Sequence, residues 1–137
     1  MHKISDVMTR QVKVVRPDDS VQNAARMMAD EDVGSLPVCD GTRLLGIITD
    51  RDIAIRAVAS GRAVDSPVRS VMTEEIVWCS DDENTQTVME RMGEHQIRRI
   101  PVVDKARNLV GIVALGDLAV ADEKNVDETL RDISMPA

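Results

Sequence analysis

The sequence predicts an α/β protein of the α+β type, built from two β-α-β-β-α repeats packed about a pseudo-two-fold axis. Three observations support this fold. The 137 residues contain one pattern twice, both copies show the same order of strand and helix signals, and one copy alone is too small to bury its own sheet. The expected boundaries are residues 1–64 for repeat 1, 65–121 for repeat 2 and 122–137 for a polar C-terminal tail.

The repetition is visible in matching segments. VMT at residues 7–9 returns at 71–73, and PV at 37–38 returns at 101–102. GI at 46–47 is followed five residues later by Asp52, and its copy at 111–112 is followed at the same spacing by Asp117. Matches in the same order and at nearly constant spacing indicate two copies of one structural unit.

Each repeat is expected to open with a short strand, at residues 13–15 and 76–78, followed by an amphipathic helix. Ser20 is a typical N-cap, and the apolar residues after it recur at helical spacing. This buried stripe is predicted at Val21, Ala24, Ala25 and Met28, and its copy at Thr85, Val88, Met89 and Met92.

A hairpin and a second helix complete each repeat. LPVCD and IPVVD begin strands that return through polar turns into LLGIIT and LVGIVA. The closing helices are expected at residues 50–60, with Gly61 as the stop signal, and at 116–122.

The composition excludes several classes of function. A net charge of −7 disfavours nucleic-acid binding, and the longest apolar runs are too short to cross a bilayer. Cys39 and Cys79 are isolated, His2 and His95 lack the spacing of zinc ligands, and we find no catalytic arrangement, so neither a metal site nor an enzyme is expected. A reducing cytoplasm is the expected location.

The most informative stretch is GIITDRD at residues 46–52. Thr49 and Asp52 have the spacing of a helix capping box, in which both side chains bind backbone N–H groups. The alternative is a ligand site, because a carboxylate can accept hydrogen bonds from ribose hydroxyls and a hydroxyl at a helix start suits phosphate. Repeat 2 has Ala114 in place of the threonine but keeps Asp117, which favours the ligand role.

These motifs resemble the cystathionine-β-synthase (CBS) domain, and the whole pattern over residues 4–121 resembles a free-standing CBS pair, or Bateman module. The resemblance implies a ribose role for Asp52 and Asp117 and a phosphate role for Thr49. It also implies a phosphate contact from Arg98 and Arg99 in the opposite repeat, where only one of the two is expected to reach the phosphate because neighbouring side chains on a strand point to opposite faces. The alternative is that both are a solvated charge pair, and Arg51 is a further candidate. The positions equivalent to these two arginines in repeat 1 are Gly34 and Ser35, so one complete site and one differently tuned site are expected.

By the same resemblance, adenine is expected in an aliphatic slot formed by residues 9–12 and 73–76, with Val12 and Ile76 as lining residues. The expected ligand is an adenine nucleotide such as AMP, ADP or ATP, or else NAD or S-adenosylmethionine, and no catalytic cofactor is expected. The alternative is a module without ligand that serves structure or protein interaction.

The expected assembly is a homodimer that acts in trans on a protein target. The helix at residues 52–60 is apolar on nearly every side, so its own sheet cannot cover it completely. The tail at 122–137 has a weak apolar stripe that could pack on the module or on a partner.

Overall fold

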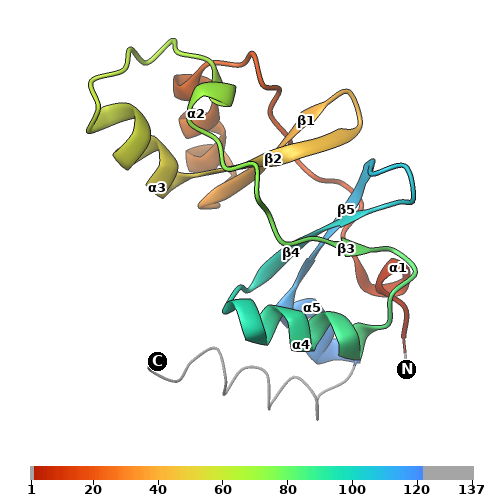
Figure 1. The fold of residues 1–137 in the computed structure, drawn as a ribbon. Coiled ribbons are helices and arrows are strands. Elements are labelled where there is room, and N and C mark those ends of the chain that lie inside the picture. Colours follow the sequence, from red (N-terminus) through yellow and green to blue (C-terminus); the bar gives the residue numbers. More distant parts are fainter. Residues whose placement is uncertain (1, 122–137) are drawn as a thin grey trace. The chain divides into compact units, whose positions relative to one another are not determined.

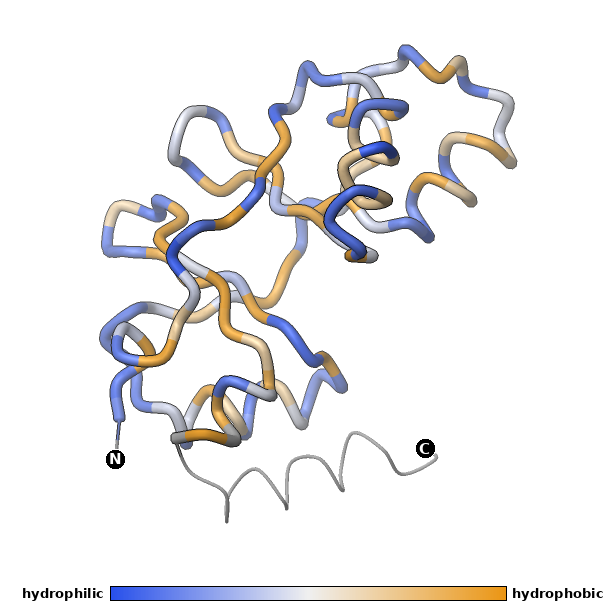
Figure 2. Tube along the Cα trace, turned by 180° about the vertical axis from the view of Figure 1, so that it is seen from behind, coloured by the Kyte–Doolittle hydropathy of each residue, from blue (hydrophilic) through white to orange (hydrophobic). Residues whose placement is uncertain are grey.

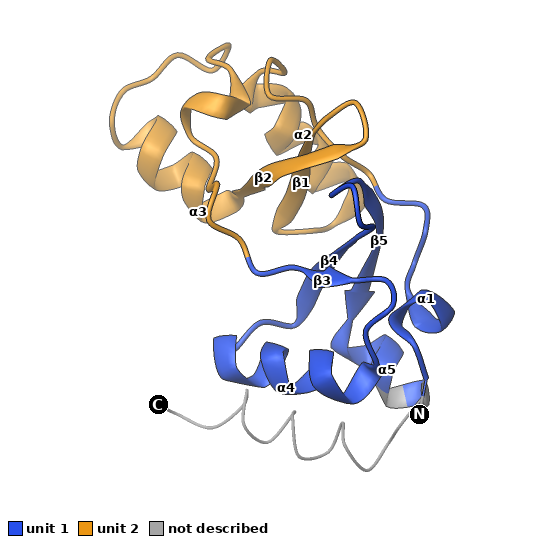
Figure 3. Cartoon of the chain, turned by 45° about the vertical axis from the view of Figure 1, so that its right-hand side comes forward, with its two compact units in different colours: residues 1–12, 77–137 blue, residues 13–76 orange. Residues whose placement is uncertain are grey.

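The computed structural model describes residues 2–121, which form two compact units. Unit 1 contains residues 1–12 together with the chain from Val77 onward, and unit 2 is Lys13–Ile76 (Figure 3). The predicted tail at 122–137 lies outside the described residues.

The compact units do not coincide with the sequence repeats, because each VMT segment pairs with the other repeat. In unit 1, Thr9 and Ile112 exchange backbone hydrogen bonds of 2.8 and 2.9 Å. In unit 2, Thr73 and Ile47 exchange a matching pair of 2.8 and 2.9 Å. Each unit is therefore completed by a short segment that the sequence repeat assigns to the other copy.

Unit 2 begins with a helix on a two-stranded hairpin (Figure 1). Helix α2 (Val21–Glu31) starts at Ser20, whose hydroxyl accepts the Asn23 N–H at 3.0 Å. Strands β1 (Ser35–Asp40) and β2 (Arg43–Thr49) pair antiparallel, with an irregularity between Val38 and Cys39. The helix, its cap and the hairpin agree with the sequence prediction, and of the predicted stripe Val21, Ala24 and Met28 are buried while Ala25 is half-buried.

Unit 1 repeats this plan with a three-stranded sheet of order β3-β4-β5. Its strands are β3 (Cys79–Ser80), β4 (Arg99–Val103) and β5 (Leu109–Ala114), and its helices are α1 (Ile4–Val7), α4 (Thr85–His95) and α5 (Leu115–Ala121). The predicted stripe of α4 is confirmed, since all four of its residues are buried. Mixed helices and small sheets confirm the α+β class.

The first strand of each repeat differs from the prediction. At residues 13–15 only Val15 pairs, as a single parallel bridge with Val38. Residues 76–78 form no strand, because parallel pairing with β4 begins one residue later, at Cys79. Parallel pairing needs register with a neighbouring strand, which the local pattern of three apolar residues does not encode.

Each unit has its own apolar core, and the hydropathy of the chain is shown in Figure 2. Both cores lack Phe and Tyr, as the composition requires, and consist of aliphatic side chains and methionine, with Cys79 added in unit 1. The core of unit 1 includes Ile4, Val88, Met89, Met92, Ile100, Val113 and Leu118, and the core of unit 2 includes Val15, Val21, Met28, Leu36, Ile48 and Val68.

The closing helix of unit 2 is present but changes its hydrogen-bond pattern. A short α-helical turn, α3 (Asp50–Asp52), continues into a π-helix, η1 (Ile53–Val58). Its wider turns are seen in the bond from Ala59 N–H to the Ala54 carbonyl, at 2.9 Å. The predicted stop at Gly61 agrees with its φ of 75°, which glycine adopts without strain. Such π turns are rare and occur preferentially at functional sites.

Candidate functional site

The stretch GIITDRD crosses from the buried end of β2 into α3, and its polar residues form a complete capping box. The Thr49 hydroxyl accepts the Asp52 N–H at 2.9 Å, and Oδ2 of Asp52 accepts the Thr49 N–H at 3.0 Å. The two side chains thus satisfy two backbone donors at the start of the helix. The capping alternative from the sequence is therefore a real feature of this site.

Asp52 has further partners that capping does not require. The residue is only 8% exposed, and the hydroxyl of Thr73 lies 3.2 Å from both Oδ1 and Oδ2. The Nε of Arg56 lies 3.8 Å from Oδ1, and the Nη1 of Arg56 donates to the Met72 carbonyl at 3.2 Å. A buried carboxylate is stable only when it is paired in this way.

Repeat 2 keeps part of the arrangement. Oδ2 of Asp117 accepts the Ala114 N–H at 3.0 Å, as Asp52 does for Thr49. The recurrence of the carboxylate therefore has a structural explanation, because in both repeats it accepts a backbone N–H three residues earlier. Recurrence of the carboxylate in repeat 2 therefore does not by itself indicate a ligand role.

The contacts of Thr73 and Arg56 with Asp52 were not predicted from the sequence, although Thr73 lies in the segment 73–76 expected at the adenine slot. The repeated VMT segment was a signal for Thr73, but its meaning depends on which strand it pairs with. Gly46 allows that pairing, because a Cβ at Gly46 would lie 2.5 Å from the Thr73 carbonyl oxygen. Arg56 follows Asp52 by one turn, a spacing at which side chains meet on a helix face.

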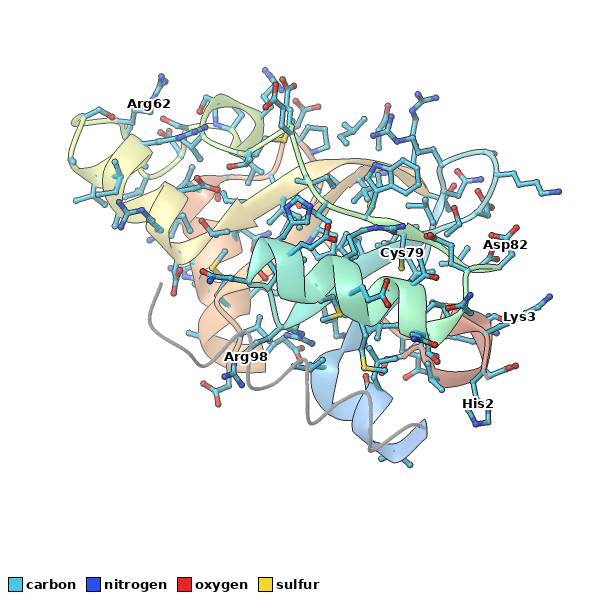
Figure 4. The ribbon with its side chains drawn as sticks, turned by 60° about the horizontal axis from the view of Figure 1, so that its bottom comes forward. His2, Lys3, Arg62, Cys79, Asp82 and Arg98 are labelled. Atoms are coloured by element: carbon cyan, nitrogen blue, oxygen red, sulfur yellow. The ribbon has the colours of Figure 1, made fainter. Side chains whose placement is uncertain are left out.

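The other predicted ligand residues are divided between the units. Arg51 is exposed beside Asp52 in unit 2, where Ile76 is half-buried. Arg98, just before β4, and Arg99, its first residue, are exposed in unit 1, and Figure 4 shows Arg98 projecting from the ribbon. Val12 is half-buried in unit 1. Their contact with a ligand at Asp52 stays a prediction.

A cavity of about 420 Å³ lies beside Asp117 within unit 1. Its described lining consists of His2, Asp6, Val7, Asp117 and Val120. These side chains supply two carboxylates, one imidazole and two apolar walls, and none of them is a lysine or an arginine. The surroundings of Asp117 thus differ in charge from those of Asp52, which has Arg51 and Arg56 nearby.

A polar cluster near Trp78 fixes the start of the sheet in unit 1. Arg91 donates to the Trp78 carbonyl at 3.0 Å and pairs with Glu83, whose carboxylate also accepts the Ser80 N–H at 2.8 Å. The hydrogen bond from Arg91 holds the pKa of Glu83 below its usual range. The guanidinium of Arg107 lies 5.3 Å from the centre of the Trp78 ring, within range of a cation–π contact.

The cysteines show no sign of reactivity. Cys39 and Cys79 are both free and buried, and burial raises the pKa of their thiols to about 11 and about 12, respectively. A thiol with a raised pKa is a poor nucleophile and a poor metal ligand. Among residues 2–121, no three His, Cys, Asp or Glu side chains gather as a metal site would require. Nor does any helix in that range have the length and apolar content needed to span a bilayer.

The chain matches one protein-family model at two places. The family model described as "CBS domain" matches twice, at residues 4–58 and 68–124. The chain belongs to the CBS-domain family. The two matches follow the sequence repeats, so the resemblance found in the motifs is confirmed, and the protein contains a CBS pair.

Small CBS proteins are similar over nearly the whole chain. The CBS domain-containing protein YhcV of Bacillus subtilis is 46% identical over 125 residues, which cover 91% of this chain and 89% of YhcV. The crystal structure of hypoxic response protein I with two coordinated zinc ions has a TM-score of 0.79 at 34% identity, and covers 89% of this chain and 100% of that one.

Two further solved structures contain adenosine-type ligands. CBSX2 in complex with AMP has a TM-score of 0.77 at 27% identity, covering 90% of this chain and 98% of CBSX2. The CBS pair of MJ0100, in complex with 5′-methylthioadenosine and S-adenosyl-L-methionine, has a TM-score of 0.73 at 28% identity, covering 88% of this chain and 95% of that one.

Proposed function

We propose that this protein is a regulatory module that binds an adenosine-type ligand and transmits its presence to another protein. The observation that carries the proposal is that similar CBS pairs bind AMP in one case and 5′-methylthioadenosine and S-adenosylmethionine in another. These ligands share an adenosyl group and differ in the substituent at its 5′ position. The shared group is therefore the part that we expect this chain to recognise.

In the proposed primary site, Asp52 accepts hydrogen bonds from the ribose hydroxyls and Thr49 contacts phosphate. Arg51, Arg98 and Arg99 are proposed to supply positive charge for the phosphate groups. Hydrogen bonds from a guanidinium to phosphate are charge-assisted and therefore short and strong. Support comes from the position of Asp52 in the first helical turn after β2, with Arg51 just before it and Arg56 one turn after it. Val12 and Ile76 are proposed to line the adenine slot.

A second site is proposed at Asp117, with a different selectivity. Its neighbouring cavity is lined by Asp6 as well as Asp117, and by no arginine or lysine among the described residues. Two carboxylates repel a phosphate group at short range. We expect this site to take an adenosyl ligand without phosphate, such as adenosine or 5′-methylthioadenosine.

We propose that ligand binding is signalled through the pairing of two copies of the protein. Ile55 and Val58 on η1 are 53% and 70% exposed, and Val120 on α5 is 91% exposed. Exposed apolar side chains that lie together on one helix face, as Ile55 and Val58 do by their spacing, are typical of a surface that a partner covers. We propose that two copies meet through these helices and that the homodimer acts in trans on a protein target in the cytoplasm, without catalysing a reaction itself.

One observation favours a second candidate function, a structural module without ligand. The capping box and the contacts of Thr73 and Arg56 already satisfy Asp52 from within the chain. A carboxylate that is satisfied internally does not need a ligand to explain its burial. Sites with this arrangement could serve folding alone.

Thermal unfolding separates the two candidates. A ligand that binds only the folded state stabilises it by about 2.7 kcal/mol at a hundredfold excess over Kd. We expect the Tm to rise with AMP, ADP, ATP, NAD, S-adenosylmethionine or 5′-methylthioadenosine, and not with guanosine monophosphate as the control base. If none of the adenosyl compounds raises the Tm at millimolar concentration, the structural module is the better account.

A further inference from the structure

The Thr73 hydroxyl donates to the carboxylate of Asp52 at the position that the ribose hydroxyls of a ligand would occupy. A hydroxyl has one hydrogen, so the two 3.2 Å contacts of Thr73 are one donation shared between Oδ1 and Oδ2. This position, in front of both oxygens, is also where a pair of vicinal hydroxyls binds a carboxylate. With Asp52 only 8% exposed, a ligand cannot reach both oxygens while the Thr73 hydroxyl stays there.

The backbone of Thr73 is fixed, but its side chain can turn. The exchange of hydrogen bonds with Ile47, at 2.8 and 2.9 Å, holds the segment against β2, and Gly46 lets it approach closely. A rotation about χ1 exchanges the hydroxyl of Thr73 for its methyl or hydrogen without moving this backbone. Opening therefore needs only a change of rotamer.

Arg56 connects the same carboxylate to the π-helix. Its Nη1 donates to the carbonyl of Met72, next to Thr73, and its Nε faces Oδ1 of Asp52 at 3.8 Å. The side chain of Arg56 is 54% exposed, so it can exchange these partners for water or for a ligand anion. A change at Asp52 thus alters a contact that ties η1 to residues 71–73.

Repeat 2 lacks this arrangement and provides a matched comparison. Thr9 makes the same backbone pair with Ile112, but in the described residues Asp117 is bonded to the Ala114 N–H and not to the Thr9 hydroxyl. The position of repeat 2 that corresponds to Arg56 is Ala121, which has no donor group in its side chain. The extra contacts belong to one repeat only, so the shared fold does not require them.

We propose that Asp52, Thr73 and Arg56 form a latch that is closed without ligand, and that a ribose-bearing ligand opens it by taking the place of the Thr73 hydroxyl. Opening releases Arg56 and changes the π-helix that carries the exposed Ile55 and Val58. This proposal rests on the proposed function of Asp52. It adds the Thr73 hydroxyl as a group that competes with the ligand for Asp52. It also adds Arg56 as the connection between this site and the exposed side chains of η1 proposed for assembly.

The test compares affinities for AMP and adenosine, measured by isothermal titration, in matched variants. Thr73→Val keeps the branched shape and removes the competing donor, so its Kd should be about two- to tenfold lower than that of the wild type. Thr73→Ser keeps the hydroxyl and should bind like the wild type.

Each outcome has a distinct meaning. If the wild type binds AMP and Thr73→Val binds it equally or more weakly, Thr73 is no competitor and the latch is refuted. If neither binds AMP or adenosine, the latch is refuted, and the proposed function fails as well when no other adenosyl compound raises the Tm. Binding by Thr73→Val alone would support the latch strongly.

Amide hydrogen exchange tests the route to the surface. Saturating AMP should change the exchange of residues 54–62 in the wild type, and Arg56→Gln should lose this change at equal saturation. Unchanged exchange in the wild type, with AMP bound, would rule out coupling through Arg56.

Discussion

Gly46 should be among the positions least tolerant of a single added methyl group. A Cβ at Gly46 would lie 2.5 Å from the carbonyl oxygen and 3.3 Å from the carbonyl carbon of Thr73. Both are backbone atoms, which cannot turn away as a flexible side chain can. Gly46→Ala must therefore push residues 71–73 away from β2.

The cost can be worked out from the contacts. Moving the segment weakens two hydrogen bonds between Thr73 and Ile47, of 2.8 and 2.9 Å, each contributing about 1 kcal/mol. Crowding of a packed site adds about 1–3 kcal/mol. We expect a total loss near 3 kcal/mol in the free energy of unfolding, or a Tm lower by roughly 10 °C for a chain of this size.

Two other glycines provide a graded comparison. At Gly111 the nearest atom to an added Cβ is the Sδ of Met8, at 2.8 Å, followed by the Thr9 carbonyl oxygen at 2.9 Å. The methionine can move, so Gly111→Ala should cost less than Gly46→Ala. At Gly116, in α5, no atom lies within 4 Å, and Gly116→Ala should be neutral or stabilising by up to about 1 kcal/mol.

Urea unfolding followed by circular dichroism measures all three variants on one scale. The expected order of destabilisation is Gly46→Ala, then Gly111→Ala, then Gly116→Ala. A stability of Gly46→Ala equal to that of Gly116→Ala would refute the pairing of residues 71–73 with β2, on which the position of Thr73 beside Asp52 depends.

Three further predictions concern assembly, the aromatic reporter and pH. Light scattering at micromolar protein should give a dimer mass that Ile55→Glu and Val58→Glu reduce, and a monomer mass independent of concentration would contradict the proposed assembly. AMP should change the emission of Trp78, the sole tryptophan in a chain without tyrosine, whereas a flat titration with binding shown independently would place the ligand elsewhere. Because Arg91 lowers the pKa of Glu83 in the folded protein, the pair stabilises fully at neutral pH, above the ordinary Glu83 value of 4.5, and its contribution is lost as the pH falls through the lowered pKa. Glu83→Gln should therefore flatten the acid side of a plot of stability against pH, and an unchanged acid limb would contradict this role.

Much of the fold could be predicted from local sequence. The spacing of Val88, Met89 and Met92 predicted the buried face of α4, and Ser20 predicted the start of α2. These features depend on neighbours within a few residues, so the pattern contains the information needed. The hairpins could be predicted for the same reason.

The features that the sequence did not reveal depend on contacts between distant residues. The pairing of Thr73 with Ile47 joins segments far apart in the chain, and nothing in VMT itself names its partner. The π-helix at Ile53–Val58 has the same apolar composition as an α-helix, so its hydrogen-bond pattern is not visible in the residue types.

The candidate site was predicted in part. Thr49 and Asp52 were identified as a pair, and the structure shows them bonded to each other at the start of α3. The reasoning from repeat 2 was incomplete, because Asp117 keeps a capping role even without a threonine hydroxyl. Sequence identity between the repeats could not separate a carboxylate kept for the fold from one kept for a ligand.

The most direct test of the proposed function is the affinity for AMP of Asp52→Asn beside Asp117→Asn. Asparagine keeps the shape of Asp52 and an oxygen for the Thr49 N–H, but it loses the charge and one acceptor for the ribose. We expect Asp52→Asn to fold and to bind AMP about ten- to a hundredfold more weakly than the wild type, since hydrogen bonds to a charged group contribute about 1.5–3 kcal/mol. Asp117→Asn should change AMP affinity less than threefold. If Asp52→Asn lowers the Tm while its Kd for AMP stays at the wild-type value, Asp52 serves the fold alone and the proposed ribose site is contradicted.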